Sequence, residues 1–356
     1  MKKTLAIILA LAMVFSLVAC GKKAETPAPA TTTPSQSSTP STPKPSASTP
    51  APAAEPVTFK VTYSENETSL FHTTMKKGYD KITEQTDGRV VFELYPSNQL
   101  GSITDTLEQM RAGAPMICYM GFDNLGDIVS DFAPASFPYT FNSCYEVFAL
   151  AKSQWMADLQ DDLGAANIYS LGFGSSGYRH FISTFEIKSA KDCAGHIMRM
   201  GPSSAAQGFI TAMGGTPTTS SWADNYSLLQ TGVIESCEAA LDLLLSSSLY
   251  EVCDYLALSG HFVTPFVAVT NVDMAGKISD ADMEIVKACH AEAASELVDQ
   301  IMANEDANVK AFKDAGTTVT EPDKASFAAV VPDLYKMLNL DPSIYDDIRA
   351  AVDANK

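Results

Sequence analysis

The sequence predicts an α/β fold for residues 57–356, with a largely parallel core sheet. Short runs of alternating apolar and polar residues indicate strands, and longer runs with a 3.6-residue period, which indicate helices, follow them. Strands and helices that alternate in this way favour a parallel sheet covered by helices. One helical pattern, which begins at the capping sequence "SDAD" (279–282), continues beyond Asn308. A helix of that length suggests a spine shared by two lobes.

The elements are expected in the following order along the chain. In the first half we expect strands at 57–63, 89–96, 116–120 and 167–173. Three helices are expected there: one that ends near Gln85, one at about 102–112 and one from Asn142 to about Leu163. In the second half we expect strands at 195–200, 233–239 and 266–272, and helices at 203–213, 222–232, from 279 past 308, at 323–338 and at 342–354.

The N-terminal residues indicate export. Lys2 and Lys3 precede an apolar segment, Leu5 to Leu17, that is short for a membrane span, and the segment ends at Cys20 in "LVAC". This end resembles the lipobox of bacterial lipoproteins, in which the cysteine is acylated and becomes the mature N-terminus. We therefore expect a lipoprotein signal peptide at 1–20 and a lipid anchor on Cys20, which would hold the protein outside the cytoplasm at the cell membrane. The alternative is an ordinary secretory signal with a chance cysteine.

Residues 21–56 form a Pro/Ser/Thr/Ala tract with almost no residues that could build a core. We expect a disordered tether between the membrane and a folded domain. As a polyproline II helix it would reach about 110 Å, and as a flexible coil roughly 35 Å.

The folded part is strongly acidic. Residues 1–56 contain five of the 24 Lys and Arg but two of the 42 Asp and Glu, so residues 57–356 carry a formal charge of −21. This charge argues against nucleic acid as a partner and against an electrostatic membrane patch. It also makes each arginine informative, and there are five: Arg89, Arg111, Arg179, Arg199 and Arg349.

Cysteine and histidine give no sign of a metal or a cofactor. Six cysteines follow Cys20 without C-x-x-C spacing, and their apolar contexts favour buried free thiols over disulfides. The five histidines are dispersed, without the paired spacing of metal ligands. We expect neither a cofactor nor a metal.

The stretch "LGFGSSGYRHF" (171–181) contains Gly172, Gly174 and Gly177 at the spacing of a dinucleotide-binding turn. Such a turn must open a helix whose N-terminus faces the pyrophosphate. Here a strand-like run follows, with Arg179 and His180 in it. We therefore reject the cofactor interpretation and expect the arginine to carry the function.

Several longer segments resemble the solute-binding proteins of tripartite ATP-independent periplasmic (TRAP) transporters, of the dicarboxylate-receptor type and in a lipoprotein form. Each motif alone is weak, but together, in the family's order over residues 57–356, they are specific. The segments are "TDGRVVFELYPSNQLGSITDTLEQMRAG", "GYRHF", "AGHIMRM", "GGTPTTSSWADNYSLLQTGVIESCEA" and "LYEVCDYLALSGH".

The resemblance implies a two-lobed clamshell, like that of periplasmic binding proteins, with mixed or parallel sheets joined by crossing strands and a long spine helix. Lobe I would comprise residues 57–176 and about 265–304, and lobe II residues 177–264 and about 305–356. The lobes would close on a small organic acid and deliver it to a TRAP membrane carrier driven by an ion gradient. The implied protein is a monomer and not an enzyme.

The resemblance places Arg199 on the family's signature arginine and Arg179 in its "G-x-R" strand. A guanidinium matches both oxygens of a carboxylate, and it is costly to bury without an anionic partner. We expect both arginines to bind the ligand. The alternatives are a structural ion pair of Arg199 with Glu238 and a structural bridge between lobes for Arg179.

Other predicted ligand-binding residues are less specific. Trp222 stands where the family often has an aromatic cover, and Glu65 lies in the loop after the first strand. Phe122 and Phe173 would suit a rather apolar acid. The family frequently has Asn where this chain has Ala239, which predicts a less hydroxylated ligand than a sugar acid.

Two other classes of function remain open. One is a binding lipoprotein of an ATP-driven (ABC) importer, which shares the export signals and the tether. The other is an extracellular hydrolase, which lacks support because neither G-x-S-x-G nor paired carboxylates occur at a recognisable spacing.

Overall fold

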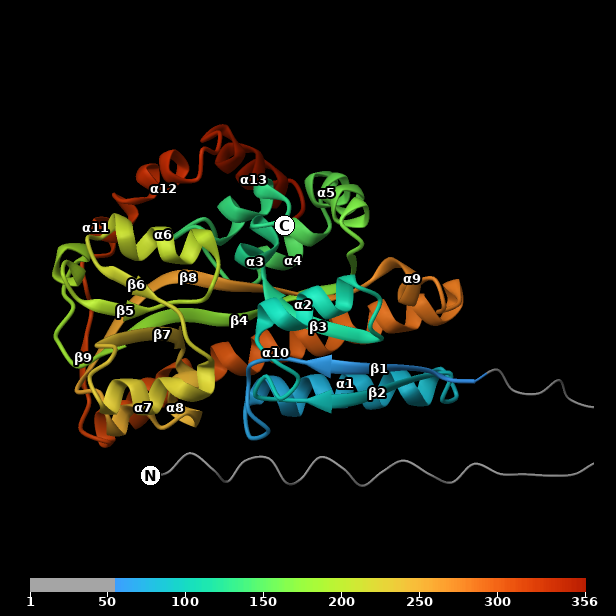
Figure 1. Ribbon diagram of the computed structural model, residues 1–356, viewed down its shortest axis with the longest axis horizontal. Helices are drawn as coiled ribbons and strands as arrows, with labels where there is room; N and C mark the ends of the chain where they lie inside the picture. The colour runs from blue at the N-terminus through green and yellow to red at the C-terminus, as the bar shows by residue number, and fades with distance from the viewer. Residues whose placement is uncertain (1–54) are drawn as a thin grey trace, which may run out of the picture. The chain divides into compact units, whose positions relative to one another are not determined.

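The computed structural model describes residues 55–356, which are drawn in colour in Figure 1. The predicted signal peptide, Cys20 and residues 21–54 of the predicted tether lie outside the described residues. Within the described part, no helix combines the length and apolarity that a membrane span requires.

One mixed sheet runs through the fold in the order β2-β1-β3-β8-β4-β7-β5-β6, and β9 pairs with β8 beside this path. At one end β1 pairs in parallel with β2 and β3, and at the other end β5 pairs in parallel with β6 and β7. We call these ends lobe I and lobe II. The strands are β1 (Val57–Thr62), β2 (Val90–Tyr95), β3 (Met116–Gly121), β4 (Tyr169–Ser183), β5 (Ile197–Arg199), β6 (Thr216–Thr218), β7 (Ser236–Ala240), β8 (Tyr255–Thr270) and β9 (Thr318–Thr320).

Two long strands cross between the lobes. β4 has 15 residues and β8 has 16, and they pair antiparallel in the middle of the sheet (Figure 1). Their register shifts between Ser170 and Gly172, between Ser175 and Tyr178, and between Arg179 and Phe181. The crossing strands make the centre of the sheet antiparallel, whereas we expected a largely parallel sheet. The sequence indicated only parts of them because Gly, Ser and Pro interrupt their apolar pattern.

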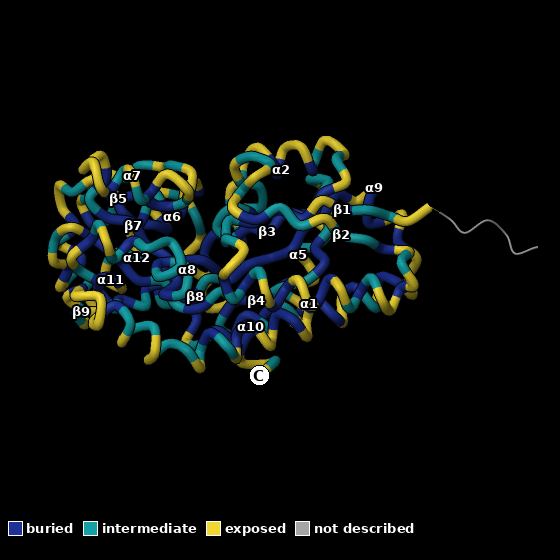
Figure 2. Tube along the Cα trace, turned by 90° about the horizontal axis from the view of Figure 1, so that it is seen from below, coloured by how far each residue is buried: buried dark blue, intermediate teal, exposed yellow. Residues whose placement is uncertain are grey.

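Both faces of the sheet are covered in each lobe, and buried residues form the interior of both (Figure 2). Successive residues of β3 point to opposite faces: Ile117 packs with α1, while Cys118 packs with α2. The helices of lobe I include α1 (Leu70–Gln85), α2 (Ile103–Arg111), α3 (Phe122–Gly126), α4 (Glu146–Ala151) and α5 (Gln154–Ala165). Those of lobe II include α6 (Ser204–Ala212), α7 (Asn225–Gln230), α8 (Leu241–Ser246), α11 (Lys324–Ala328) and α12 (Val331–Met337).

The long helix is present as α10 (Asp280–Asp314), with 35 residues. The Ser279 side chain caps it by accepting a hydrogen bond from the backbone N–H of Asp282, as predicted. Its buried residues contact lobe I through Val286 and lobe II through Phe312. One helix therefore serves both lobes.

The glycines of the stretch at 171–181 allow α10 and β8 to approach β4 closely. A Cβ atom on Gly172 would lie 2.2 Å from Nδ1 of His290 on α10, and one on Gly174 would lie 2.4 Å from the ring of Phe266. No helix opens after the motif, because β4 continues through it to Ser183. The glycines serve packing and not a phosphate cradle.

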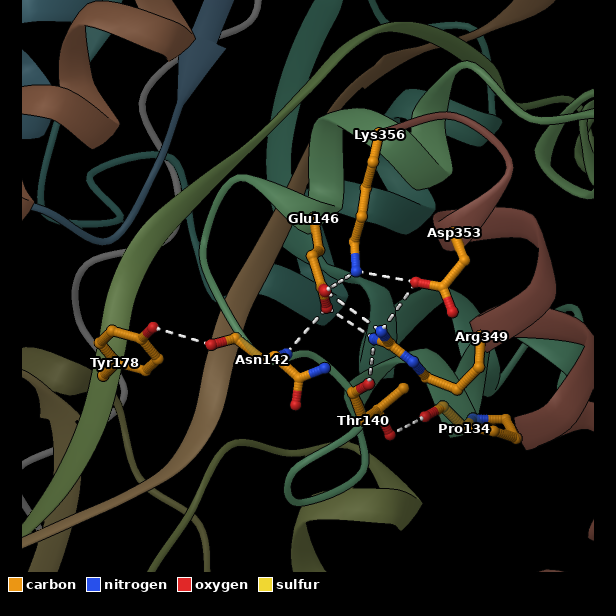
Figure 3. Close-up of polar contacts among 8 residues, drawn as sticks. All are labelled: Pro134, Thr140, Asn142, Glu146, Tyr178, Arg349, Asp353 and Lys356. Carbon is orange, nitrogen blue, oxygen red and sulfur yellow. Dashed lines mark hydrogen bonds and ion pairs between the residues drawn. The ribbon is translucent and has the colours of Figure 1, made fainter.

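The C-terminal helix α13 (Ser343–Asp353) departs from the predicted lobe boundaries. Its Ile348 and Val352 are buried against lobe I, whereas we expected residues 305–356 in lobe II. Arg349 donates to Glu146 of α4 at 2.6 and 3.1 Å, and Nζ of Lys356 lies 2.8 Å from the same carboxylate (Figure 3). The apolar face and this buried ion pair hold the helix on lobe I.

Two predicted helices are divided. The helix expected from Asn142 to Leu163 is α4 and α5, because the side chain of Ser153 caps a new helix by accepting from Met156 N at 3.2 Å. The helix expected at 323–338 is α11 and α12. The six cysteines of the described residues are all buried and unpaired, which confirms the prediction of free thiols.

Candidate functional site

A cavity of about 170 Å³ lies between the two lobes. Lobe I contributes residues that follow β1 and β3, and lobe II contributes residues that follow β5 and β7. The carboxyl ends of parallel strands meet at one edge of a sheet, so each lobe presents several chain segments to the cavity. The crossing strand β4 adds Ser176 and Arg179, and β8 adds residues 262–266.

Arg199, the last residue of β5, lines the cavity although it is only 7% exposed. Its Nη2 donates to the carbonyl oxygen of Ser220 at 2.9 Å, its Nε has no partner, and its guanidinium lies 5.4 Å from the centre of the Trp222 ring. Among the described residues, no carboxylate lies within 4.0 Å of it. Burial lowers the pKa of Arg199, as expected for a buried cation that forms no ion pair.

Arg179 has a different environment. Its guanidinium makes two charged hydrogen bonds to the carboxylate of Glu238, and Nη2 also donates to the Glu238 carbonyl at 2.9 Å. Glu238 is 1% exposed, and Nε2 of His261 lies 3.6 Å from its carboxylate. Burial alone would raise the pKa of Glu238, but the Arg179 charge, the nearby His261 and the hydrogen bonds from Arg179 outweigh burial and hold it at about 2.

This pairing overturns one of the alternatives from the sequence. Glu238 is the partner of Arg179 and not of Arg199, so the structural ion pair considered for Arg199 does not form. Glu238 and Arg179 belong to neighbouring antiparallel strands, β7 and β4, in which Arg179 pairs with Ala240. The sequence could not give that register.

Four of the predicted ligand-binding residues line this one cavity: Glu65, Arg179, Arg199 and Trp222. Glu65 is half-buried, and Oε2 accepts a hydrogen bond from its neighbour Ser64 at 3.3 Å. Trp222 begins a 3₁₀ turn before α7, and its Nε1 donates to Ser247 Oγ at 2.9 Å. These contacts fix the indole beside the guanidinium of Arg199.

Phe122, Phe173 and Ala239 do not line the cavity, contrary to expectation. Phe122 is fully buried and packs edge-on against Phe173, with ring centres 5.9 Å apart. Ala239 points away because side chains alternate along β7, which turns Glu238 and Ala240 to the cavity and Ala239 to the opposite core. The expected loss of a polar ligand contact at position 239 therefore has no basis in this geometry.

Two acidic lining residues were not predicted. Asp123, in the first turn of α3, accepts a hydrogen bond from Ser203 Oγ at 2.5 Å, and Asp242, in the first turn of α8, accepts from Leu70 N at 3.3 Å. Burial raises the pKa of both carboxyl groups. Their positions just after β3 and β7 could have indicated them as lining residues, since the ends of the strands at this edge of the sheet face the cavity.

The same contacts join the lobes beside the cavity. In one contact Ser203 of lobe II donates to Asp123 of lobe I, and in the other Leu70 of lobe I donates to Asp242 of lobe II. Nearby, Asn66 Nδ2 donates to the carbonyl oxygen of Ser246 at 3.4 Å. The lobes thus touch through polar groups in this arrangement, and the lining residues of both lobes face a common space.

Comparisons with known proteins agree with this geometry. The family model of the bacterial extracellular solute-binding proteins, family 7, matches residues 61–340. The sialic acid-binding periplasmic protein SiaP of Vibrio cholerae is 25% identical over 280 residues, which cover 78% of this chain and 87% of that protein. The C4-dicarboxylate-binding periplasmic protein DctP of Rhodobacter capsulatus is 25% identical over 260 residues, or 71% of this chain and 78% of that protein.

Among solved structures, a TRAP periplasmic solute-binding protein from Actinobacillus succinogenes, with bound L-galactonate, superimposes with a TM-score of 0.80. It is 28% identical, and the alignment covers 83% of this chain and 99% of that one. The match spans both lobes and the crossing strands, which confirms the predicted two-lobed α/β fold. With most of its length matched by the family model, this chain belongs to family 7 of the bacterial extracellular solute-binding proteins.

Proposed function

We propose that this protein is the receptor of a TRAP transporter and captures a small organic acid by pairing its carboxylate with Arg199. The membership of the chain in a solute-binding family supports a receptor over an enzyme. Its likeness to a TRAP solute-binding protein supports delivery to a TRAP carrier over delivery to an ATP-driven importer.

The observation that carries the proposal is the guanidinium of Arg199, which lines the cavity without an ion-pair partner among the described residues. A buried cation needs an anionic partner, and the described residues offer Arg199 none. A ligand carboxylate would accept two parallel hydrogen bonds from the guanidinium fork, in a setting where desolvation strengthens them. Trp222 beside it would exclude water from that pair.

The remaining predicted lining residues would have supporting roles. Arg179 is already neutralised by Glu238, so it would contribute hydrogen bonds and shape rather than an unsatisfied charge. Glu65, on the loop after β1, would contact the end of the ligand that faces lobe I. Phe122, Phe173 and Ala239 are omitted from the proposed site because they lie outside the cavity lining.

Capture would require the lobes to open and close. The crossing strands β4 and β8, the helix α10 and the segment between α12 and α13 link the lobes covalently, and register shifts in the β4–β8 pairing give places where the strands can bend. The predicted lobe boundaries near 176 and 264 fall on these strands. We propose that they act as the hinge, with α13 moving with lobe I.

The export signals complete the proposal. Acylation of Cys20 would anchor the chain at the cell membrane, and the tract that follows would let the receptor reach its carrier. Each buried acyl methylene contributes about 0.8 kcal/mol, so two chains would anchor it stably. The receptor is proposed to act as a monomer.

A thermal-shift screen of organic acids tests the proposal. The panel contains succinate, L-galactonate, N-acetylneuraminate, 2-oxo acids and amino acids, with matched neutral amides or alcohols as controls. An acid at 100 times its Kd adds about 2.7 kcal/mol of stability, which raises the melting temperature while its uncharged counterpart leaves it unchanged. If no acid shifts the melting curve, or if the amides shift it equally, the carboxylate receptor is wrong.

A further inference from the structure

The cavity lining holds more negative charge than a receptor for an anion needs. Six of its residues are ionisable as Asp, Glu or Arg, and among these Arg179 and Glu238 neutralise each other. Arg199 then contributes one positive charge, and Glu65, Asp123 and Asp242 contribute three negative ones. None of these three acids has a basic partner within 4.0 Å among residues 55–356. The lining therefore carries a formal charge of −2.

Two of the three acids lie near each other on facing lobes. Glu65 belongs to the loop between β1 and α1, and Asp242 accepts a hydrogen bond from Leu70 at the end of that loop. Asn66, next to Glu65, contacts Ser246 at the other end of α8. Burial raises the pKa of Glu65; hydrogen bonds and the charge of Arg179 lower it, and the charge of Asp242 raises it, so the two carboxylates are close enough to interact.

These two carboxylates also have unused acceptor capacity. Glu65 receives one side-chain hydrogen bond, from Ser64, and Asp242 receives one, from the Leu70 N–H. A carboxylate has about four acceptor positions. Asp123 differs in the strength of its partner, because it accepts a short hydrogen bond of 2.5 Å from Ser203 Oγ, whereas the bond from Leu70 N to Asp242 is 3.3 Å long. Glu65 and Asp242 are left as acceptors that face the cavity.

The charge of the ligand decides how well each class of acid would fit. A monocarboxylate would bring the filled cavity to a formal charge of −3, and a dicarboxylate to −4. An acid that also carries an ammonium group would leave it at −2 and would bring a cation into a lining that contains Glu65 and Asp242. Desolvation makes such differences larger in a closed cavity than in water.

We propose that the preferred ligand is a zwitterionic amino acid, whose carboxylate binds Arg199 and whose ammonium group binds Glu65 and Asp242. This proposal rests on the receptor function proposed above. The rest of the ligand would lie against the apolar part of the lining, which includes Phe71, Leu243 and Phe266. The substrate class is therefore amino acids with an apolar body rather than sugar acids or dicarboxylates.

Calorimetric titration with acids that share a carbon skeleton tests the substrate class. The probes are leucine and phenylalanine, each as both enantiomers, their 2-hydroxy counterparts and the unsubstituted acids. 3-Aminobutanoate and 4-aminobutanoate, with their hydroxy counterparts, cover other spacings of the amino group, and succinate and L-galactonate represent the competing classes. A charge-assisted hydrogen bond contributes about 1.5–3 kcal/mol, so at least one amino acid should bind roughly tenfold or more tightly than its hydroxy counterpart.

Variants test the placement of the ammonium group. With the tightest amino acid probe, Glu65→Gln and Asp242→Asn should each lower the affinity about tenfold or more, since each removes one charged acceptor. With the hydroxy counterpart, the same changes should leave the affinity unchanged or raise it, because they remove repulsion. Glu284→Gln on the exposed face of α10, which does not line the cavity, is the matched control. Melting curves without ligand establish whether each variant is folded. If Asp242→Asn does not fold, the comparison of the two probes in Glu65→Gln alone tests the placement of the ammonium group.

The outcomes separate this inference from the function on which it rests. Tighter binding of succinate, L-galactonate or the hydroxy acids would overturn the amino acid class while leaving a carboxylate receptor in place. Equal losses of affinity for the amino and hydroxy probes in Glu65→Gln would also overturn it, because the Glu65 carboxylate would then not bind the amino group. Absence of binding by every acid would overturn both proposals.

Discussion

Arg179 and Arg199 both line the cavity, yet their replacement by alanine should affect the stability of the ligand-free protein to very different extents. Arg179→Ala would leave the carboxylate of Glu238, which is 1% exposed, without its ion-pair partner. The nearest remaining basic group would be His261, whose Nε2 lies 3.6 Å away. Breaking a buried ion pair by removing one partner costs about 3–5 kcal/mol. Arg199→Ala removes a buried cation that has no carboxylate partner, so it relieves a desolvation cost while losing one hydrogen bond and the contact with Trp222.

These energies convert to melting temperatures through the size of the folded part. An unfolding entropy of about 2.1 cal/mol/K per residue gives roughly 0.6 kcal/mol/K for about 300 residues. Arg179→Ala should therefore lower the melting temperature by about 5–8 °C, while Arg199→Ala should change it by about 2 °C or less. Differential scanning calorimetry of the ligand-free protein measures both, with Lys77→Ala on the exposed face of α1 as the control.

The stability deficit of Arg179→Ala should also depend on pH, in a direction that His261 determines. Burial lowers the pKa of His261, and the charge of Arg179 lowers it further, while Glu238 raises it. In Arg179→Ala the imidazole should accept a proton more readily and neutralise Glu238, so the deficit should be smaller at pH 5.5 than at pH 8. Equal melting of Arg179→Ala and the wild type at pH 8, or an equal loss in Arg199→Ala, would refute the assignment of a structural role to one arginine and a ligand-binding role to the other.

Three further predictions concern anchoring, motion and acid stability. Cys20→Ser should release the protein from the membrane fraction or leave it unprocessed, and retention there with an unchanged lipid label would exclude the lipoprotein assignment. Small-angle scattering should show a smaller radius of gyration at a saturating concentration of a bound acid, whereas identical curves would count against hinge closure. Burial raises the pKa of Glu146, but Arg349, Lys356 and the Asn142 N–H outweigh burial and hold it at about 2, below its ordinary 4.5. Its contribution to stability should thus be complete above pH 4.5 and lost as the pH falls toward 2, so urea unfolding between pH 6 and 3 should show a steeper loss in the wild type than in Glu146→Gln/Arg349→Gln.

The sequence indicates elements where a local pattern determines them. The cap at Ser279 and the periodicity after it predict α10, and the alternation at 57–63 predicts β1. The long crossing strands were only partly predicted because Gly172, Gly174 and Pro265 weaken the pattern of a strand. The two glycines allow α10 and β8 to approach β4 closely, which is a tertiary requirement that a single sequence does not display.

The candidate site shows the same limit. Residue type and the family resemblance located Arg179, Arg199, Glu65 and Trp222 at the cavity, but not which arginine Glu238 neutralises. That partner depends on the register between β4 and β7. Ala239 was misplaced for a related reason, because a shift of one residue along a strand moves a side chain to the other face of the sheet.

The proposed role of Arg199 is tested most directly by calorimetric titration of the wild type and Arg199→Lys with the tightest acid from the screen. Lysine keeps the positive charge but loses the planar fork, and truncating one side of a desolvated pair costs about 2–5 kcal/mol. The affinity should therefore fall roughly 30-fold or more while the ligand-free melting temperature stays within about 2 °C. Unchanged affinity in a folded Arg199→Lys variant would contradict the account and leave Arg179 as the next candidate for the carboxylate.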